Sequence, residues 1–263
     1  MRKAIIITST AIAALVLSAA ALAAAGSFNT YTATVSVSPS GAGTTAKPVA
    51  DGFRTLLTAS GTSGNRAAPL TDIKTTIYGL KSNGKDFPTC SATKIAASKS
   101  DSFCPKGALV AQGPVKSLLG AAIQPTSAGT PCNPYLHVWN AGQGKLTFFF
   151  VIIPPKYICA TLSTGASAPY PGTLTQSGKN MVMNVPLPPD VSTAAGGLTG
   201  VYASLISEDL TWKKQTTKVK GKTVGYFQSV GCQKGKRPYS TAFTALSFAG
   251  ASGTSTVSGS TGC

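Results

Sequence analysis

Seven carboxylates and one histidine are the residues of this chain that could carry out acid–base chemistry. The carboxylates are Asp51, Asp72, Asp86, Asp101, Asp190, Glu208 and Asp209. Glycoside hydrolases use two carboxylates that face each other across a cleft. Glu208 and Asp209 are adjacent, so on a strand their side chains would point to opposite faces. We therefore interpret the seven carboxylates as solvated loop acids rather than as a catalytic pair.

His137 is the one residue that could act as the general base of a serine hydrolase. It alternates with Leu136 and Val138 in a segment typical of a strand, beside Trp139. A triad also needs an aspartate that orients the histidine and a serine nucleophile, and the chain has no G-x-S-x-G motif. Calcium-binding D-x-D-x-D-G loops and the phosphate-binding motif G-x-x-x-x-G-K-[ST] are absent too. The sequence therefore predicts no catalytic residue, no cofactor and a protein that is not an enzyme.

The six cysteines are interpreted as a disulfide framework. They are Cys90, Cys104, Cys132, Cys159, Cys232 and Cys263. No C-x2-C pair occurs and His137 lies apart from the cysteines, so we expect no zinc or other metal site. Six cysteines allow fifteen pairings, and spacing alone does not choose among them. Short local loops favour the sequential scheme, which pairs Cys90 with Cys104, Cys132 with Cys159, and Cys232 with Cys263.

The N-terminal segment is typical of a signal peptide. Arg2 and Lys3 precede an uncharged apolar stretch from Ile5 to Leu22, and small residues follow at a cleavage position. We therefore predict that residues 1–25 are a signal peptide and that residues 26–263 are secreted, with association to the cell surface as an option. In that compartment disulfides persist. Later apolar runs are too short for a membrane-spanning helix, so we expect no transmembrane anchor.

Short alternating segments separated by Gly, Pro, Asn and Ser predict ten to twelve strands. Pairs of segments around turns predict hairpins that join 135–140 to 146–153, 174–176 to 181–186, and 201–212 to 224–230. One short helix is expected over 91–98, with Ser91 as its N-cap and Ile95 pointing inward. The pattern predicts an all-β fold, a single antiparallel β-sandwich of jelly-roll or Ig-like type with at most one or two short helices. A split near 120–130 into two smaller β units is the alternative.

Basic residues are concentrated near the C-terminus of a chain whose formal net charge is +16. The polyanion-binding candidates, with no carboxylate among them, are Lys213, Lys214, Lys218, Lys220, Lys222, Lys234, Lys236 and Arg237. A hairpin of 201–212 with 224–230 would carry five of these lysines at its tip. Such a tip suits an anionic envelope polymer, a glycan or lipid headgroups. The alternative is a solvated hairpin whose lysines prevent edge-to-edge aggregation.

Aromatic residues offer a competing, carbohydrate-binding interpretation. A flat platform could be formed by Trp139, Trp212, Tyr78, Tyr135, Tyr202 and Tyr226, although strand aromatics more often belong to a core. We expect no nucleic-acid partner, because stacking aromatics are not interleaved with the lysines and the protein is exported. The expected role is a structural or adhesive protein of the cell envelope or extracellular space. The alternatives are a glycan-binding or hydrolytic module and a membrane-active β protein.

Two segments, Phe87–Gly113 and Val230–Cys263, resemble parts of uncharacterised secreted, disulfide-containing β-rich proteins of actinobacteria. The first has the order cysteine, short helix, Cys-Pro and Gly/Val strand, here with Cys90 and Cys104-Pro105. The second contains Gly231-Cys232-Gln233-Lys234-Gly235 and ends at the last cysteine. The resemblance covers about half of the chain. It implies a β-rich secreted architecture, and it implies no activity because that family has none assigned.

Overall fold

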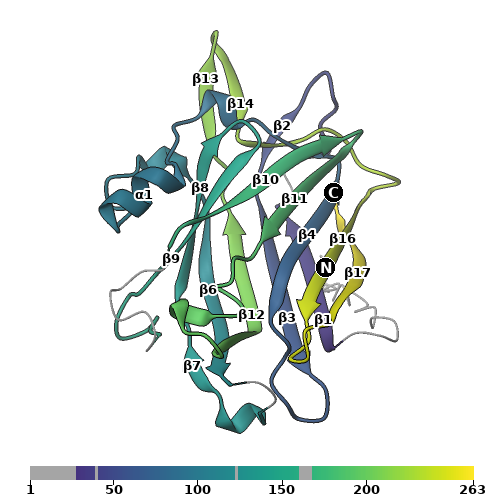
Figure 1. Cartoon of the computed structure of the whole chain (residues 1–263). Helices are drawn as coiled ribbons and strands as arrows, with labels where there is room; N and C mark the ends of the chain where they lie inside the picture. Colours follow the sequence, from purple (N-terminus) through teal and green to yellow (C-terminus); the bar gives the residue numbers. More distant parts are fainter. Residues whose placement is uncertain (1–27, 39–40, 122–123, 160–167) are drawn as a thin grey trace, which may run out of the picture.

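One long antiparallel sheet makes up most of the protein (Figure 1). The computed structural model describes residues 28–38, 41–121, 124–159 and 168–263. The predicted signal peptide, residues 1–25, lies outside the described residues.

The sheet has twelve strands, and eleven of them follow one another along a single path. In spatial order these are β1 (Asn29–Val37), β3 (Phe53–Gly61), β12 (Tyr202–Trp212), β6 (Leu109–Gly120), β8 (Tyr135–Gly142), β9 (Lys145–Val151), β10 (Tyr170–Ser177), β11 (Asn180–Pro186), β4 (Leu70–Tyr78), β16 (Lys236–Leu246) and β17 (Ser252–Gly262). The short strand β7 (Thr130–Cys132) pairs with the end of β6. The sheet curls until β1 and β17 lie side by side, so it is barrel-like and nearly closed.

The predicted all-β, antiparallel class is confirmed, but the predicted sandwich is not. A sandwich consists of two separate sheets packed face to face, whereas here each strand pairs with the next around one curled sheet. Strands from before and after residues 120–130 are interleaved in this sheet, since β12 lies between β3 and β6, and β4 lies between β11 and β16. The predicted hairpins β8–β9 and β10–β11 are present.

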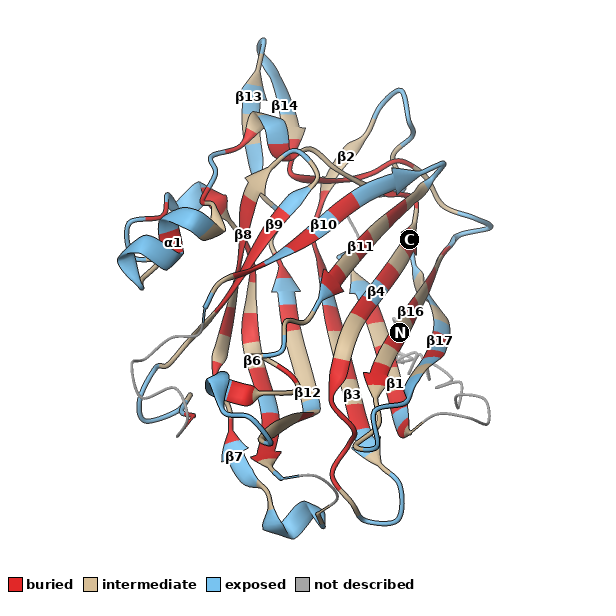
Figure 2. Cartoon of the chain, in the orientation of Figure 1, coloured by how far each residue is buried: buried red, intermediate tan, exposed pale blue. Residues whose placement is uncertain are grey.

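Alternating burial along the strands shows which face encloses the core. In β1, Tyr31, Ala33 and Val35 are buried while the residues between them are more exposed. The same alternation runs through β3 and β16 (Figure 2). Because successive side chains on a strand point to opposite faces, one face of the curled sheet holds the apolar interior.

A small second sheet plugs one end of the interior. It consists of β2 (Val49–Asp51), β15 (Phe227–Ser229) and β5 (Leu80–Ser82). Phe227 makes edge contacts with Phe53 and Trp212, which lie at the ends of β3 and β12. The neighbouring Tyr226 is also buried and donates a hydrogen bond to Asn140 Oδ1 at 3.2 Å. Aromatic packing therefore closes this end of the sheet.

One hairpin prediction was wrong. The strand β12 pairs with β3 and β6 inside the large sheet, not with residues 224–230. The lysine-bearing connection instead forms its own short hairpin from β13 (Thr216–Val219) and β14 (Lys222–Gly225), which projects beyond the sheet (Figure 1). After it the chain enters β15. An alternating pattern indicates which face of a strand is buried but not which strand lies beside it.

The helical segments lie outside the curled sheet or in its connections. They are α1 (Ala92–Ser98) and the 3₁₀ turns η1 (Gly84–Asp86), η2 (Lys106–Ala108), η3 (Thr126–Ala128) and η4 (Ala195–Gly197). As predicted, Ser91 caps α1, its Oγ accepting from the Lys94 N–H, and Ile95 is fully buried. Ile95 belongs to a cluster with Trp139 and Phe149 on the outer face of β8 and β9. None of the described helices is long and apolar enough to span a membrane.

Three disulfides link the connections. They join Cys90 to Cys104, Cys132 to Cys159 and Cys232 to Cys263, with Cα–Cα distances of 5.5, 4.0 and 6.2 Å. This is the sequential pairing that the sequence analysis favours. The first closes the loop that carries α1, the second ties β7 to the segment after β9, and the third holds the last strand to the turn before β16.

Candidate functional site

The two ends of the curled sheet differ in charge. Strand register places the connections 41–52, 79–90, 143–144, 178–179 and 213–235 at one end. The connections 62–69, 124–134, 152–159, 187–201 and 247–251 lie at the other end. We call the first the basic end and the second the cavity end. The loop 91–108, which carries α1, packs on the outer face of β8 and β9 and is counted with neither end.

Ten exposed lysines lie in or beside the connections of the basic end. They are Lys47, Lys85, Lys145, Lys179, Lys214, Lys218, Lys220, Lys222, Lys234 and Lys236. Two carboxylates accompany them: Asp51 is buried, and Asp86 accepts a hydrogen bond from Asn83 at 2.7 Å. The described connections of the cavity end carry three charged side chains: Arg66, which is buried, Asp190, which is half-buried, and Lys156, which is exposed.

The projecting hairpin carries three of these lysines at its tip. Lys218, Lys220 and Lys222 are all exposed (Figure 2). Lys218 Nζ donates to Thr223 Oγ1 on the facing strand at 2.8 Å, and Lys220 turns the chain with a φ of 48°. The sequence placed five lysines at this tip, but Lys213 and Lys214 lie at its base. Lys213 is half-buried, and this burial lowers the pKa of its ammonium group.

Arg237 was wrongly included among the surface candidates. It is 1% exposed, and its Nη1 donates to the carbonyls of Tyr78, Gly79 and Gly231 while Nη2 donates to Ser229 Oγ. Burial lowers the pKa of the guanidinium, although its planar array of donors still suits several carbonyl acceptors. Arg237 therefore holds the turns of the basic end together and is not available to a partner.

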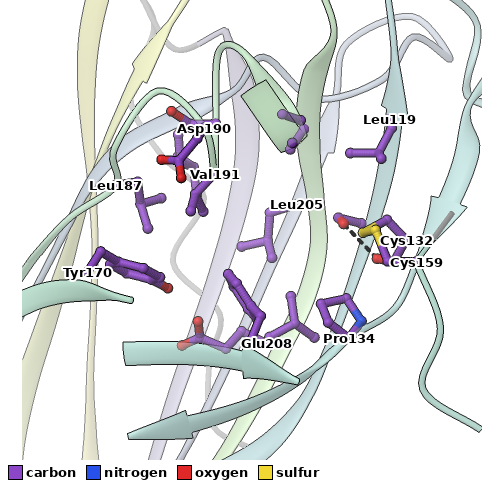
Figure 3. Close-up of a pocket in the computed structure, with 18 of the residues that line it drawn as sticks. Leu119, Cys132, Pro134, Cys159, Tyr170, Leu187, Asp190, Val191, Leu205 and Glu208 are labelled. Atoms are coloured by element: carbon purple, nitrogen blue, oxygen red, sulfur yellow. Dashed lines mark hydrogen bonds between the residues drawn. A yellow bond between two sulfur atoms is a disulfide. The ribbon is translucent and has the colours of Figure 1, made fainter. Parts of the chain in front are cut away.

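A cavity lies inside the sheet toward the opposite end (Figure 3). The centre of a water molecule can reach about 90 Å³ of it. The walls are mainly apolar and include Leu119, Phe150, Leu187 and Leu205, together with the Cys132–Cys159 disulfide. A single buried water needs roughly 10–15 Å³ on such a scale, so the space suits several waters or one small molecule.

Glu208 brings a carboxyl group into this apolar wall because β12 contains a bulge. Leu205 and Glu208 both line the cavity, although strict alternation would place them on opposite faces. The pairing of β12 with β6 shifts between Leu205 and Ser207, leaving Ile206 exposed as the extra residue. After the bulge, Glu208 points inward and Asp209 outward, where Asp209 Oδ1 accepts from Arg54 Nε at 2.6 Å.

The environment of Glu208 shifts its titration. Burial raises the pKa of this carboxyl from its usual value to about 7, since the charged form loses hydration among apolar side chains. No hydrogen bond or ion pair joins Glu208 to any residue that the structure describes. Tyr170 lies nearby on β10 (Figure 3), and the pKa of its phenol is raised by burial and by the negative charges of Glu208 and Asp190.

A second, smaller cavity lies deeper in the interior. It shares Ile73, Tyr170, Leu187 and Glu208 with the first and extends to Trp212. Glu208 and Tyr170 therefore lie between the two cavities and line both of them. The sequence analysis treated Glu208 as a solvated loop acid, and this interpretation was wrong.

His137 has an aspartate partner that sequence spacing did not indicate. Its Nδ1 lies 2.6 Å from Asp101 Oδ2, and Trp139 Nε1 donates to the same oxygen at 3.1 Å. Asp101 belongs to the loop closed by the Cys90–Cys104 disulfide. Within the described part of the chain, no serine or threonine hydroxyl hydrogen-bonds to His137, so the third member of a triad is missing. The pair joins the helical loop to β8.

The proposed aromatic platform does not form as a set. Trp139, Trp212 and Tyr226 are buried and contribute to the core, while Tyr78, Tyr135 and Tyr202 are half-buried on different strands. Tyr135 instead packs against Tyr157, with ring centroids 4.7 Å apart. Across the described residues, no three His, Cys, Asp or Glu side chains come together as metal ligands.

Compared with protein-family models, curated proteins and solved structures, the chain matches none of them. The resemblance of Phe87–Gly113 and Val230–Cys263 to secreted actinobacterial proteins therefore stays a prediction.

Proposed function

We propose that the protein is an exported, non-enzymatic envelope or extracellular protein that binds an anionic polymer through its basic end. Three disulfides support an oxidising compartment, because such bonds persist outside the cytosol. Its role is adhesive or structural, with a polymer of repeating negative charge as the partner.

The observation that carries this proposal is the concentration of exposed lysines at one end of the sheet. Like charges gathered on one surface repel one another, and a polyanion relieves this repulsion while releasing its own counterions. A solubilising role alone would be served equally well by lysines spread over both ends. The few charges at the cavity end instead make the molecule electrically asymmetric.

The alternatives have less support. A glycan platform needs exposed aromatic side chains in a row, and three of the six candidates are buried. Membrane insertion of the projecting hairpin needs apolar side chains at its tip, where Lys218, Lys220 and Lys222 stand instead.

The test compares two variants with the same change in net charge. The basic-end variant carries glutamine at Lys218, Lys220, Lys222, Lys234 and Lys236. The control variant carries glutamine at Lys74, Lys94, Lys106, Lys116 and Lys156, which are exposed elsewhere. Both are loaded on immobilised heparin, the probe polyanion, and eluted with a salt gradient.

We expect the basic-end variant to elute at a much lower salt concentration than wild type and the control to stay close to wild type. Screening over about 8 Å at physiological ionic strength makes such exposed contacts salt-sensitive. Both variants should keep the wild-type melting temperature, since surface lysines contribute little to stability. Equal losses in the two variants would mean that net charge alone drives retention, and the proposal would be wrong.

A further inference from the structure

We propose that the cavity beside Glu208 is a binding site for a small apolar amine, whose ammonium group pairs with the Glu208 carboxylate. This site is separate from the basic end and does not depend on polyanion binding. Its walls supply the apolar contacts, and its few polar groups select the ligand.

The polar groups of the cavity favour a positively charged or donating ligand. Glu208, Asp190 and the Tyr170 hydroxyl line the space, and among the described residues no Lys, Arg or His side chain lines it. The two serine hydroxyls in the wall already donate hydrogen bonds within the protein, Ser117 Oγ to the Cys132 carbonyl and Ser192 Oγ to the Pro188 carbonyl. An anionic ligand such as a fatty acid would meet two carboxylates and no counter-charge.

Glu208 is the group that points to a ligand. A carboxylate among apolar side chains, with no partner in the described structure, is unfavourable unless a cation or donor satisfies it. An ammonium group placed there would pair with it in a region of low polarity, where such a pair is stronger than in water. The adjoining apolar walls would take the hydrocarbon part of the amine.

The space limits the ligand to a ring or a short chain. About 90 Å³ is open to the centre of a water molecule, and the second hollow adds about 20 Å³ next to Glu208 and Tyr170. The end near Asp190 and Val191 is bounded by the connection 187–201, and Figure 3 shows these two side chains across the cavity from Glu208. A single six-membered ring with a short arm fits this description.

The test uses three probes of matched shape: cyclohexylmethylamine, cyclohexylmethanol and cyclohexanecarboxylate. Binding to the full-length mature protein is followed by NMR titration at pH 8. We expect the amine to bind at least tenfold more tightly than the alcohol and the carboxylate not to saturate. Glu208→Gln should lose at least tenfold in affinity for the amine and leave the alcohol unchanged.

Asp209→Asn is the matched control, because it removes the adjacent carboxylate on the outer face and gives the same net charge. It should bind the amine as wild type does. Ala203→Leu, which fills the cavity wall, should abolish binding of both amine and alcohol. Amine affinity should also rise between pH 5.5 and 8 as Glu208 ionises, with Tyr170 neutral throughout and Asp190 the other carboxyl that lines the space.

The proposal is overturned if no probe binds, if alcohol and amine bind equally to wild type, or if Glu208→Gln retains the amine preference. The heparin experiment is unaffected by any of these results, so the two proposals fail separately.

Discussion

The basic end and the cavity end of the same sheet are built in opposite ways. At the basic end, a small sheet fills the interior with Phe227 and Tyr226, and the surface carries exposed lysines. At the cavity end, the interior is hollow, few charges lie in the connections, and Ile153, Ile158 and Leu198 are exposed. A filled, highly charged end suits contact with a surface, whereas a hollow, weakly charged end suits binding of a small molecule.

Both ends nevertheless use a buried arginine as a structural clamp. At the cavity end, Arg66 donates to the carbonyls of Leu118, Tyr202 and Ala121. At the basic end, Arg237 binds the turn carbonyls described above. Guanidinium groups can satisfy several carbonyl acceptors at once, which ammonium groups do less well. The arginines thus hold connections together, and the lysines remain on the surface.

The largest expected effect is the loss of stability on removing the buried Arg237, compared with removing the exposed Lys236 beside it. Arg237→Met should lower the free energy of unfolding by about 4 kcal/mol, because several buried carbonyls lose a charged donor. The adjacent Lys236→Gln should change it by less than about 0.5 kcal/mol. Denaturant unfolding with the disulfides intact measures both. Similar effects of the two changes would contradict the assignment of Arg237 to the interior.

The next largest effect is the pH dependence of stability that Glu208 causes in the cavity. Burial raises the pKa of Glu208 to about 7 in the folded protein, so the unfolded chain releases this proton at lower pH than the folded one. The free energy of unfolding should therefore fall as pH rises from about 5 to above 7, by at most about 3 kcal/mol. Glu208→Gln should remove this dependence and leave the variant more stable than wild type at pH 8.5.

Asp209→Asn is again the control, because the pKa of Asp209 is lowered by its hydrogen bond with Arg54. Stability from that pair is present above the ordinary carboxyl pKa and is lost only as the pH falls into the acid range. The control should thus show the same pH dependence of the free energy of unfolding as wild type between pH 5 and 8.5. If Glu208→Gln keeps the wild-type pH dependence over this range, Glu208 is solvated rather than buried.

The smallest effect tests whether the His137–Asp101 pair is structural. Asp101→Ala removes the acceptor shared by His137 and Trp139 and should lower the free energy of unfolding by about 1–2 kcal/mol. Heparin retention and amine binding should not change, because neither site contains these residues. A variant that folds but loses either binding property would show that the pair supports function.

Local pattern predicted much of the fold. Alternation located β1 and β4, Gly-rich turns located the β8–β9 and β10–β11 hairpins, and Ser91 marked the start of α1. These features depend on neighbouring residues in the chain. The partner of β12 depends on long-range register, and the curl of the sheet depends on all strands together, so neither could be read from a local pattern.

The candidate site was less accessible to sequence reasoning for the same reason. The inward direction of Glu208 follows from a bulge at Ile206, which no residue type in that stretch marks. Asp101 reaches His137 from 36 residues away. The lysine run was visible, but the additional lysines at Lys47, Lys85, Lys145 and Lys179 join it only because the strand ends meet there. The alternating pattern of β16 would have predicted that Arg237 is buried, because it lies two residues before Tyr239 and therefore on the same, inward face.

The most direct test of the account is to map, on the unaltered protein, which lysines a polyanion covers. Acetylation of the free and heparin-bound protein, followed by mass spectrometry of peptides, gives a protection value for each lysine. The account predicts strong protection of Lys218, Lys220, Lys222, Lys234 and Lys236, and unchanged reactivity of Lys74, Lys116 and Lys156. Protection spread evenly over both sets, or confined to the second, would contradict docking through the basic end.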